Sequence, residues 1–385
     1  MPDRARAHLL IAGLTTRALA VSAARAGYRV TAIDAFGDLD LRAVATVIMP
    51  PASGGSRFDP PAAVLSAEPV SAGLVAYTSN LENYPEEVAR LTSGRRLLGN
   101  PPEVLVRVRN PIELMRSLRR NGFATPKTRA TPPARSRSHW LLKSRRSGGG
   151  HGVSIWHRGS LLPRSSYLQE RIEGIPGSVV FAANGRGAVV LGLTRQLVGD
   201  IRFGAHGFRY CGSLLAGRSN RLFPGQLELL GRVSAMATVA AREFGLMGLN
   251  GIDFIARRGV PYPVEINPRY SASMELLERA RGLSLFEVHA GACEGTLPAP
   301  VPLAEEIYGK AIVFARRDLT VGETRPWAGH PSFADVPHPG ERIERGRPIC
   351  TVFASERRVG GCMKRLVRLA AAVYRIARPV RRRAA

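Results

Sequence analysis

The sequence predicts a multidomain protein of the α/β and α+β classes, and three observations lead to this fold class. First, 385 residues with 45% hydrophobic content, 40 Gly and 28 Pro are typical of a turn-rich globular protein with room for two or three domains. Second, the chain opens with alternating strand and helix patterns, as in a doubly wound parallel sheet. Third, strand patterns dominate from about Trp140 onward.

The opening unit alternates short apolar runs with a helical pattern. Residues 8–13 (HLLIAG) predict a buried strand, residues 14–27 a helix, and residues 28–34 (YRVTAID) a second strand. Two more strands are predicted at residues 45–49 and 73–77. The first turn reads GLTTR and lacks the GxGxxG fingerprint, so the sequence does not predict a dinucleotide cofactor.

Polar residues follow two of these strands, where ligands collect in open α/β sheets. They form a candidate site for a small substrate, and ordinary helix capping would explain the same residue types. The candidate substrate residues are Thr15, Ser79, Asn80 and Glu82, with Thr16 and Asn83 beside them.

The rest of the chain follows a boundary at GNPP, residues 99–102. Two helices and a proline-rich connector precede the strand-rich part, which holds one long helix and ends before a basic tail. The predicted elements are helices at 103–109 and 112–122, a connector at 125–138, strands from 140 to 197, a helix at 227–245, a strand pair at 248–268, helices at 273–281 and 285–294, and a β-like segment at 307–354.

The net charge of +25 comes from a general preference for arginine. Four of the 55 basic residues are lysines, and the arginines are spread along the chain, whereas nucleic-acid binders concentrate charge on one face. The tail differs, because residues 357–383 contain no acid and predict an amphipathic basic helix ended by Pro379. Contact with acidic lipid, nucleic acid or a partner subunit and a frayed terminus both remain open for this tail.

Cysteine spacing and hydropathy exclude other classes. Cys211, Cys293, Cys350 and Cys362 are scattered, without the paired spacing of a zinc site or a disulfide framework. No apolar run reaches the roughly 18 residues that a membrane span needs, so we expect a cytoplasmic protein.

The first motif with chemical meaning is WLLKSRRSGGGHGV. A predicted strand carries Lys143, and glycines follow at 148, 149, 150 and 152. Glycines let backbone N–H groups approach phosphate oxygens, and a lysine adds a mobile positive charge. The motif lacks the GK[ST] of a Walker A loop, and taken alone it is also consistent with a plain hairpin.

The second motif is YLQERIEG at residues 167–174. Backbone groups beside such a strand can pair with a purine edge, although an exposed strand of alternating polarity looks the same.

The third motif joins GLNGIDFIARRG to YPVEINPR. If these segments pair as a hairpin, Asp253 and Glu265 lie side by side, and the two-residue period puts Glu265, Asn267 and Arg269 on one face. Carboxylate and amide oxygens suit magnesium, and Arg269 suits the phosphates of a nucleotide. A surface ladder of ion pairs is the alternative, but Asn267–Pro268 would serve no purpose in one.

In their order along the chain, these three motifs resemble the ATP-grasp superfamily, and the overall pattern is similar to predicted carboligases related to biotin carboxylase. The resemblance covers roughly residues 1–300 and implies an ATP-grasp fold with a Rossmann-like N-terminal domain and a small β-rich C-terminal lobe. The implied division is a Rossmann-like domain at 1–105, an ATP-grasp domain at 106–300 with a lid at about 135–175, a β-rich lobe at 301–358, and the basic tail at 359–385.

The resemblance also implies the site. ATP would be bound with Mg²⁺ (or Mn²⁺), and Arg269 would act on the transferred phosphoryl group as the catalytic residue. The implied ATP-binding residues are Lys143, Gly148, Gly149, Gly150, Gly152, Gln169, Glu170, Arg171 and Ile172, and the implied metal ligands are Asp253, Glu265 and Asn267. Two family positions differ: Arg107 or Arg109 stands near the usual first ATP lysine, and IPGS stands where a ribose-binding acid is usual.

The implied activity is that of a ligase that activates a carboxylate as an acyl phosphate for attack by an amine. Its small-molecule substrates could belong to the biosynthesis of a pterin- or furan-type one-carbon cofactor, and the protein could form a homodimer. A carboxylase like biotin carboxylase, a small-molecule kinase, and a non-catalytic ATP- or nucleic-acid-binding protein are the alternatives.

Overall fold

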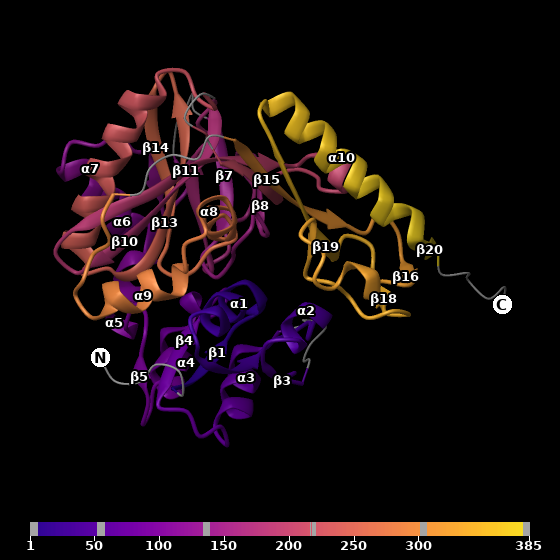
Figure 1. The fold of residues 1–385 in the computed structure, drawn as a ribbon. Helices are drawn as coiled ribbons and strands as arrows, with labels where there is room; N and C mark the ends of the chain where they lie inside the picture. Colours follow the sequence, from indigo (N-terminus) through magenta and orange to yellow (C-terminus); the bar gives the residue numbers. More distant parts are fainter. Residues whose placement is uncertain are drawn as a thin grey trace.

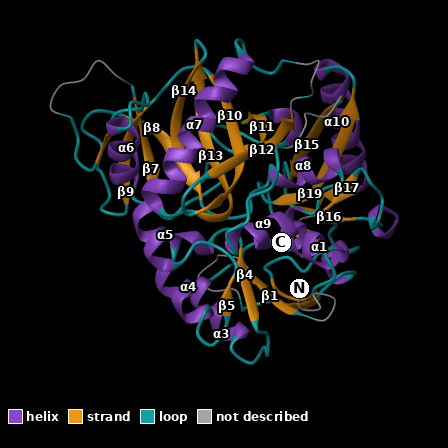
Figure 2. Cartoon of the chain, turned by 60° about the vertical axis from the view of Figure 1, so that its left-hand side comes forward, coloured by secondary structure: helices purple, strands orange, loops and turns teal. Residues whose placement is uncertain are grey.

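The computed structural model describes residues 7–51, 58–133, 139–215, 217, 221–300 and 306–379. Within these ranges the strands form four sheets (Figures 1 and 2). The N-terminal sheet lies below the others in Figure 1, and the C-terminal elements extend to one side.

The N-terminal sheet is entirely parallel, in the order β3-β2-β1-β4-β5. After His8 its central strand is apolar, as expected for a strand covered on both faces, and Leu9, Leu10 and Ile11 are fully buried. The predicted doubly wound opening is therefore confirmed. The strands are β1 (His8–Ala12), β2 (Arg29–Ile33), β3 (Thr46–Ile48), β4 (Leu74–Tyr77) and β5 (Arg96–Leu97).

Helices surround this sheet and lead away from it. They are α1 (Arg17–Arg25), α2 (Leu39–Arg42), α3 (Pro60–Ala67), the short η2 (Leu81–Asn83) and α4 (Pro85–Leu91), followed by α5 (Pro102–Val108) and α6 (Pro111–Arg120). The chain order reverses between β1 and β4, so the loops after these two strands border one crevice. The candidate substrate residues lie in those loops.

The largest sheet has eight strands, in the order β14-β13-β10-β11-β12-β15-β19-β17. Alternation along β10 divides its core: Val179 and Phe181 pack with helix α7, whereas Val180 and Ala182 pack with α9 on the other face. The strands are β10 (Ile175–Asn184), β11 (Ala188–Val198), β12 (Tyr210–Leu215), β13 (Met247–Arg257), β14 (Val260–Asn267), β15 (Ile307–Phe314), β17 (Phe333–Ala334) and β19 (Pro348–Glu356). The helices beside them are α7 (Gln226–Phe244), α8 (Met274–Arg281) and α9 (Leu285–Cys293).

A four-stranded antiparallel sheet, in the order β6-β9-β7-β8, carries the glycine-rich turn. Its small core consists of Trp140, Trp156 and Leu168. The strands are β6 (Thr128–Arg129), β7 (Trp140–Ser144), β8 (Val153–Trp156) and β9 (Ser166–Glu170), and the turn joins β7 to β8.

The C-terminal elements include the predicted basic helix. Helix α10 (Val359–Ile376) is confirmed, and it buries Cys362, Leu366, Ala370 and Val373 against the large sheet. Residues 380–385 of the predicted tail lie outside the described residues. The domain boundaries themselves stay predictions. The remaining elements are β16 (Leu319–Val321), β18 (Arg342–Ile343) and β20 (Ala377–Pro379), which form a three-stranded sheet, with the short helices η3 (Ile201–Phe203) and η4 (Arg325–Trp327).

In the part of the chain that the structure describes, we find no helix with the length and apolarity that crossing a membrane requires.

A buried ion-pair network joins the N-terminal sheet to the large sheet. Glu275 on α8 pairs with Arg17 on α1 and, at 3.0 Å, with Lys310 on β15. Arg17 also pairs with Asp335 at 2.9 Å. Burial acts to raise the pKa of Glu275, but the charges of Arg17, Lys310 and Arg279 hold this pKa well below its usual range. Glu275 is therefore ionised and links the two sheets.

We predict that Glu275→Gln lowers the stability at pH 7 by about 3 kcal/mol, because two buried cations lose their shared carboxylate. The depressed pKa of Glu275 contributes stability that is present above its unfolded pKa and lost as the pH falls through its folded pKa. The difference between variant and wild type should therefore shrink below about pH 4. Urea midpoints from pH 7 to pH 3 measure this. Glu323→Gln removes an exposed pair and serves as the control; an equal effect of both substitutions would contradict the prediction.

Candidate functional site

The pairing of β13 with β14 brings the predicted metal ligands together. Asp253 and Glu265 are direct cross-strand partners, and Gly251 pairs with Asn267. The Asn267 Nδ2 donates a hydrogen bond to Asp253 Oδ2 at 3.1 Å. The predicted hairpin is therefore present, with two carboxylates and an amide on one side of it.

The two carboxylates differ in their electrostatics. Burial and the charge of Glu265 raise the pKa of Asp253 to about 6. Burial also acts to raise the pKa of Glu265, but the charges of Arg109, Lys143 and Arg269 lower it below its ordinary value. The negative charge of Glu265 disfavours ionisation of Asp253. A bound cation would relieve this repulsion between the two carboxylates.

The side-chain oxygens of the three predicted metal ligands are of the kind that a divalent cation binds. Among the described residues, no group of three or more His, Cys, Asp and Glu side chains is placed to hold one ion. Asp253, Glu265 and Asn267 offer two carboxylates and one amide instead, and Mg²⁺ typically takes one or two carboxylates and completes its shell with phosphate and water. The residues present fit such a cation.

Lys143 approaches the same carboxylates from the four-stranded sheet. Its Nζ donates to Gln169 Oε1 at 3.1 Å and lies 5.7 Å from the ring centroid of Tyr167. Burial acts to lower the pKa of Lys143, but Tyr167 and Glu265 raise it above its usual value. Gln169 in turn donates to the carbonyl oxygen of Val264 on β14 at 3.3 Å, which connects the two sheets.

Arg109 occupies the centre of the site. Its guanidinium donates to Glu265 Oε2 at 3.4 Å, to the carbonyl oxygen of Ile266 at 3.0 Å and to Asn83 Oδ1 at 2.8 Å. It also donates to the carbonyl oxygen of Ser147, at the start of the glycine-rich turn, at 3.2 Å. Arg107, in contrast, is half exposed and pairs with Glu113. The geometry thus singles out Arg109 from the two arginines near the family's first ATP lysine.

Arg269 connects the candidate metal residues to the N-terminal sheet. It donates twice to Glu82 Oε1, at 2.8 and 3.0 Å, and once to Asn267 Oδ1 at 3.3 Å. Glu82 is 1% exposed, and its Oε2 has no hydrogen-bond partner among the described residues. Thus one of the candidate substrate residues lies in direct contact with the predicted catalytic arginine.

The glycine-rich turn packs against the segment before β12. The carbonyl oxygen of Gly149 accepts a hydrogen bond from the Tyr210 N–H at 3.0 Å. Gly150 has φ +79°, and a Cβ there would lie 1.9 Å from the carbonyl oxygen of Phe208, so only glycine fits. The turn needs glycine for this approach, whether or not phosphate binds it.

The other predicted residues lie around this centre. Thr15 is exposed at the end of β1, and Ser79 and Asn80 are half-buried after β4, where Asn80 accepts a hydrogen bond from Asn83. Glu170 accepts from the Lys127 N–H at 3.1 Å. Gly148 and Gly152 lie in the glycine-rich turn, and Arg171 and Ile172 follow β9.

Sequence reasoning missed several neighbours of the site. Tyr167 lies beside Lys143, and hydrogen bonds from Ser178 and Gln196 lower the pKa of Asp253 against the effect of burial. Ser178 pairs with Asp253 across β10 and β13, a partnership between distant segments that gives no local signal. Lys310, which pairs with Glu275, lies outside the three motifs, and its one sequence signal is that lysine is rare in this chain.

Comparisons with known proteins agree with this arrangement. Residues 108–273 match the family model of the ATP-grasp domain. A stretch of 114 residues is 32% identical to an uncharacterized protein of Methanocaldococcus jannaschii. That stretch makes up 30% of this chain and 28% of the relative, so the match spans less than a third of the relative's length.

Solved structures resemble the whole chain. Biotin carboxylase of Campylobacter jejuni has a TM-score of 0.71 at 14% identity, covering 96% of this chain and 91% of that one. L-amino acid ligase of Bacillus licheniformis has a TM-score of 0.68 at 13% identity, covering 98% and 99%. At these identities the likeness establishes the fold. The chain has the ATP-grasp fold, and its residues 108–273 match the ATP-grasp domain.

We predict that Arg109→Met loosens the glycine-rich turn, because the Ser147 carbonyl loses its donor and Glu265 loses a neighbouring charge. Amide hydrogen exchange in peptides covering residues 144–152 should be at least about 5-fold faster, which corresponds to about 1 kcal/mol of lost local protection. Arg107→Met is the control. Unchanged exchange in Arg109→Met would show that this arginine does not hold the turn.

Proposed function

We propose that the protein is an ATP- and Mg²⁺-dependent ligase that activates a carboxylate as an acyl phosphate for attack by an amine. The observation that supports this most is a convergence of parts. Lys143 of the four-stranded sheet donates to Gln169, which donates to Val264 on β14, the strand that carries Glu265 and Asn267. Against the effect of burial, the charge of Glu265 helps to raise the pKa of Lys143, so the half-buried lysine and the paired carboxylates of Asp253 and Glu265 belong to one site.

In this proposal Lys143 and the glycine-rich turn hold the phosphates of ATP. A lysine ammonium group attracts phosphate oxygens through its charge, and backbone N–H groups donate hydrogen bonds to them. The contact between Lys143 and Gln169 sets the position of the ammonium group, and residues 169–172 would line the adenine.

Asp253, Glu265 and Asn267 would hold the metal, which supplies charge neutralisation for the phosphate oxygens when bound. The protein's own part is to keep these ligands in register. Arg109 and Lys143 keep Glu265 ionised, so it is ready to accept a cation at neutral pH. Ser178, Gln196 and Asn267 do the same for Asp253, against the effect of burial.

Arg269 would stabilise charge on the transferred phosphoryl group. Phosphoryl transfer depends on positioning and on neutralising charge, and a guanidinium supplies both. Its contact with Glu82 fixes the guanidinium between the candidate metal residues and the loop after β4. Since Thr15, Ser79 and Asn80 lie in the neighbouring loops, we propose that the acceptor substrate binds there.

The finer assignment concerns pathway and assembly. The names of similar structures include an L-amino acid ligase and a biotin carboxylase, which respectively support amine ligation and, as a second candidate, carboxylation. Synthesis of a pterin- or furan-type one-carbon cofactor and self-association as a homodimer are proposals that rest on the sequence resemblance. A cytoplasmic location is a proposal that rests on the hydropathy of the sequence.

The test of the activity is ADP release over a panel of carboxylic acids crossed with amines, with bicarbonate as a separate arm. We predict release that depends on one acid–amine pair and falls by about 10²-fold or more in Glu265→Ala, because a charge that organises the phosphates is lost. Glu287→Ala, on the exposed face of α9, is the matched control. Release with bicarbonate in place of an organic acid would favour the carboxylase, and release with neither would contradict the proposed function.

Nucleotide binding is tested separately from turnover. Lys143→Met should weaken ATP binding about 10- to 100-fold, since a charge-assisted hydrogen bond contributes about 1.5–3 kcal/mol. Isothermal titration with a non-hydrolysable ATP analogue and Mg²⁺ measures this, and the exposed Lys364→Met is the control. Equal affinities for the two variants would remove Lys143 from the ATP site.

A further inference from the structure

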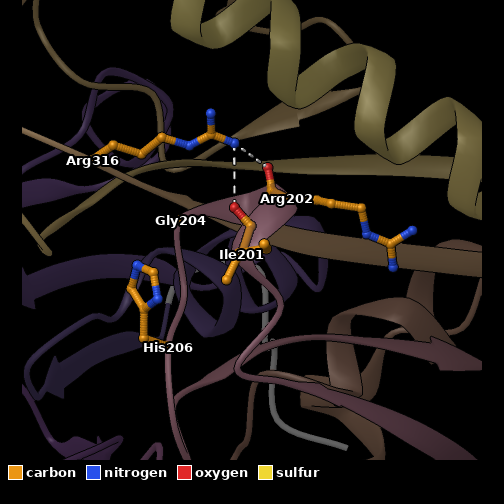
Figure 3. A pocket seen from close by; sticks show the side chains of 5 residues that line it. All are labelled: Ile201, Arg202, Gly204, His206 and Arg316. Carbon is orange, nitrogen blue, oxygen red and sulfur yellow. Dashed lines mark hydrogen bonds between the residues drawn. The ribbon is translucent and has the colours of Figure 1, made fainter.

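Two adjoining cavities lie on the other side of the segment that supports the glycine-rich turn. Their volumes are about 400 and 310 Å³, and they share Gly204, His206 and Arg316. Figure 3 shows the first cavity, and Arg209 and Arg345 also line the second. We call this combined space the arginine cleft. Among the described residues, none of those that line it is acidic.

The cationic side chains of the arginine cleft are held by neutral groups. Arg316 donates to the carbonyl oxygens of Ile201 and Arg202 at 3.3 and 3.0 Å, and its guanidinium lies 4.2 Å from the ring centroid of Tyr374 (Figure 3). Arg209 donates to the Gly346 carbonyl and lies 5.0 Å from the ring centroid of Phe314. These contacts hold the guanidinium groups of Arg316 and Arg209 in place and leave their positive charges without a negative partner among the described residues.

Within the described ranges, the contacts of three neighbouring carboxylates do not include the guanidinium groups of the cleft, although Asp318 contacts the backbone of Arg345. The Arg202 side chain extends away from Arg316 and pairs with Asp200 at 2.6 Å (Figure 3). Glu344 pairs with Arg347 at 3.5 Å, and Asp318 accepts from the backbone N–H of Arg345. In the described part of the chain, no ion pair engages Arg209, Arg316 or Arg345.

The local charge is therefore in excess. Partial burial and the nearby Arg347 lower the pKa of the Arg209 guanidinium. Burial lowers the pKa of His151 in the glycine-rich turn, and the charges of Arg209 and Arg347 lower it further. Like charges kept this close destabilise the protein unless an anion binds among them.

The arginine cleft is separate from the candidate metal site. Arg209 directly precedes β12, and its guanidinium contacts Gly346 and Phe314 of the C-terminal elements. Tyr210 lies on the side of Asp253, whose charge, after burial, helps to raise the pKa of the tyrosine. The Tyr210 N–H also binds the carbonyl oxygen of Gly149, so this segment separates the cleft from the site while contacting the turn.

We propose that the arginine cleft binds a small phosphate-bearing anion at a second site, distinct from that of ATP. One guanidinium group can form two parallel hydrogen bonds to phosphate oxygens. The three positive charges of Arg209, Arg316 and Arg345 match a phosphate monoester or a diphosphate better than a single carboxylate. The volume is sufficient for a phosphorylated metabolite. The bound anion would stabilise the segment that supports the glycine-rich turn.

The experiment is isothermal titration of the full chain with pyrophosphate at fixed ionic strength, after saturation with a non-hydrolysable ATP analogue and Mg²⁺. Wild type should bind pyrophosphate saturably. Arg316→Gln and, as a second variant, Arg345→Gln should each weaken this binding about 5- to 30-fold, the loss expected for one charge-assisted contact. Arg317→Gln removes the same charge from an exposed neighbour outside the cleft and should change the affinity less than about 2-fold.

Three results would overturn the proposal. They are the absence of saturable binding in wild type, an equal loss in Arg317→Gln and Arg316→Gln, and displacement of the ATP analogue by pyrophosphate. The titration of the analogue alone reports on the ATP site, so failure of the cleft and failure of the proposed ligase activity are distinguishable.

Discussion

The candidate site depends on the antiparallel register of β13 and β14. This register places Asp253 opposite Glu265 and leaves Asn267 within hydrogen-bonding distance of Asp253. A shift by one residue would turn these side chains to the other face of the sheet. Two half-buried carboxylates on paired residues are costly by themselves, and the surrounding cations reduce that cost. The composition of the rest of the site follows from this requirement for positive charge.

Each of these cations connects a different part of the fold to the carboxylates. Arg269 reaches Glu82 in η2, which follows β4 of the N-terminal sheet, and Arg109 reaches the glycine-rich turn. Lys143 comes from the four-stranded sheet. The site is therefore assembled from three sheets, and the buried network around Glu275 holds the first of them against the largest.

The local sequence pattern predicted many of these strands and site residues. It could not predict contacts between residues that are far apart in the sequence. The alternation of residue types around Asp253 and Glu265 predicted that they are cross-strand partners in a hairpin. The apolar runs predicted the parallel N-terminal sheet. The contact of Glu82 with Arg269 joins residues 187 positions apart, and it depends on how two sheets dock. The choice of Arg109 over Arg107 likewise required the helix rotation that α5 adopts. The arginine cleft left no signal, because its arginines lie within a chain that uses arginine throughout.

A crystal structure with a non-hydrolysable ATP analogue and Mg²⁺ tests the central claim most directly. The account predicts a metal ion with carboxylate oxygens of Asp253 and Glu265 at about 2.0–2.1 Å, phosphates beside Lys143, and the adenine beside residues 169–172. A nucleotide bound elsewhere, or bound here with both carboxylates turned away from the metal, would contradict it.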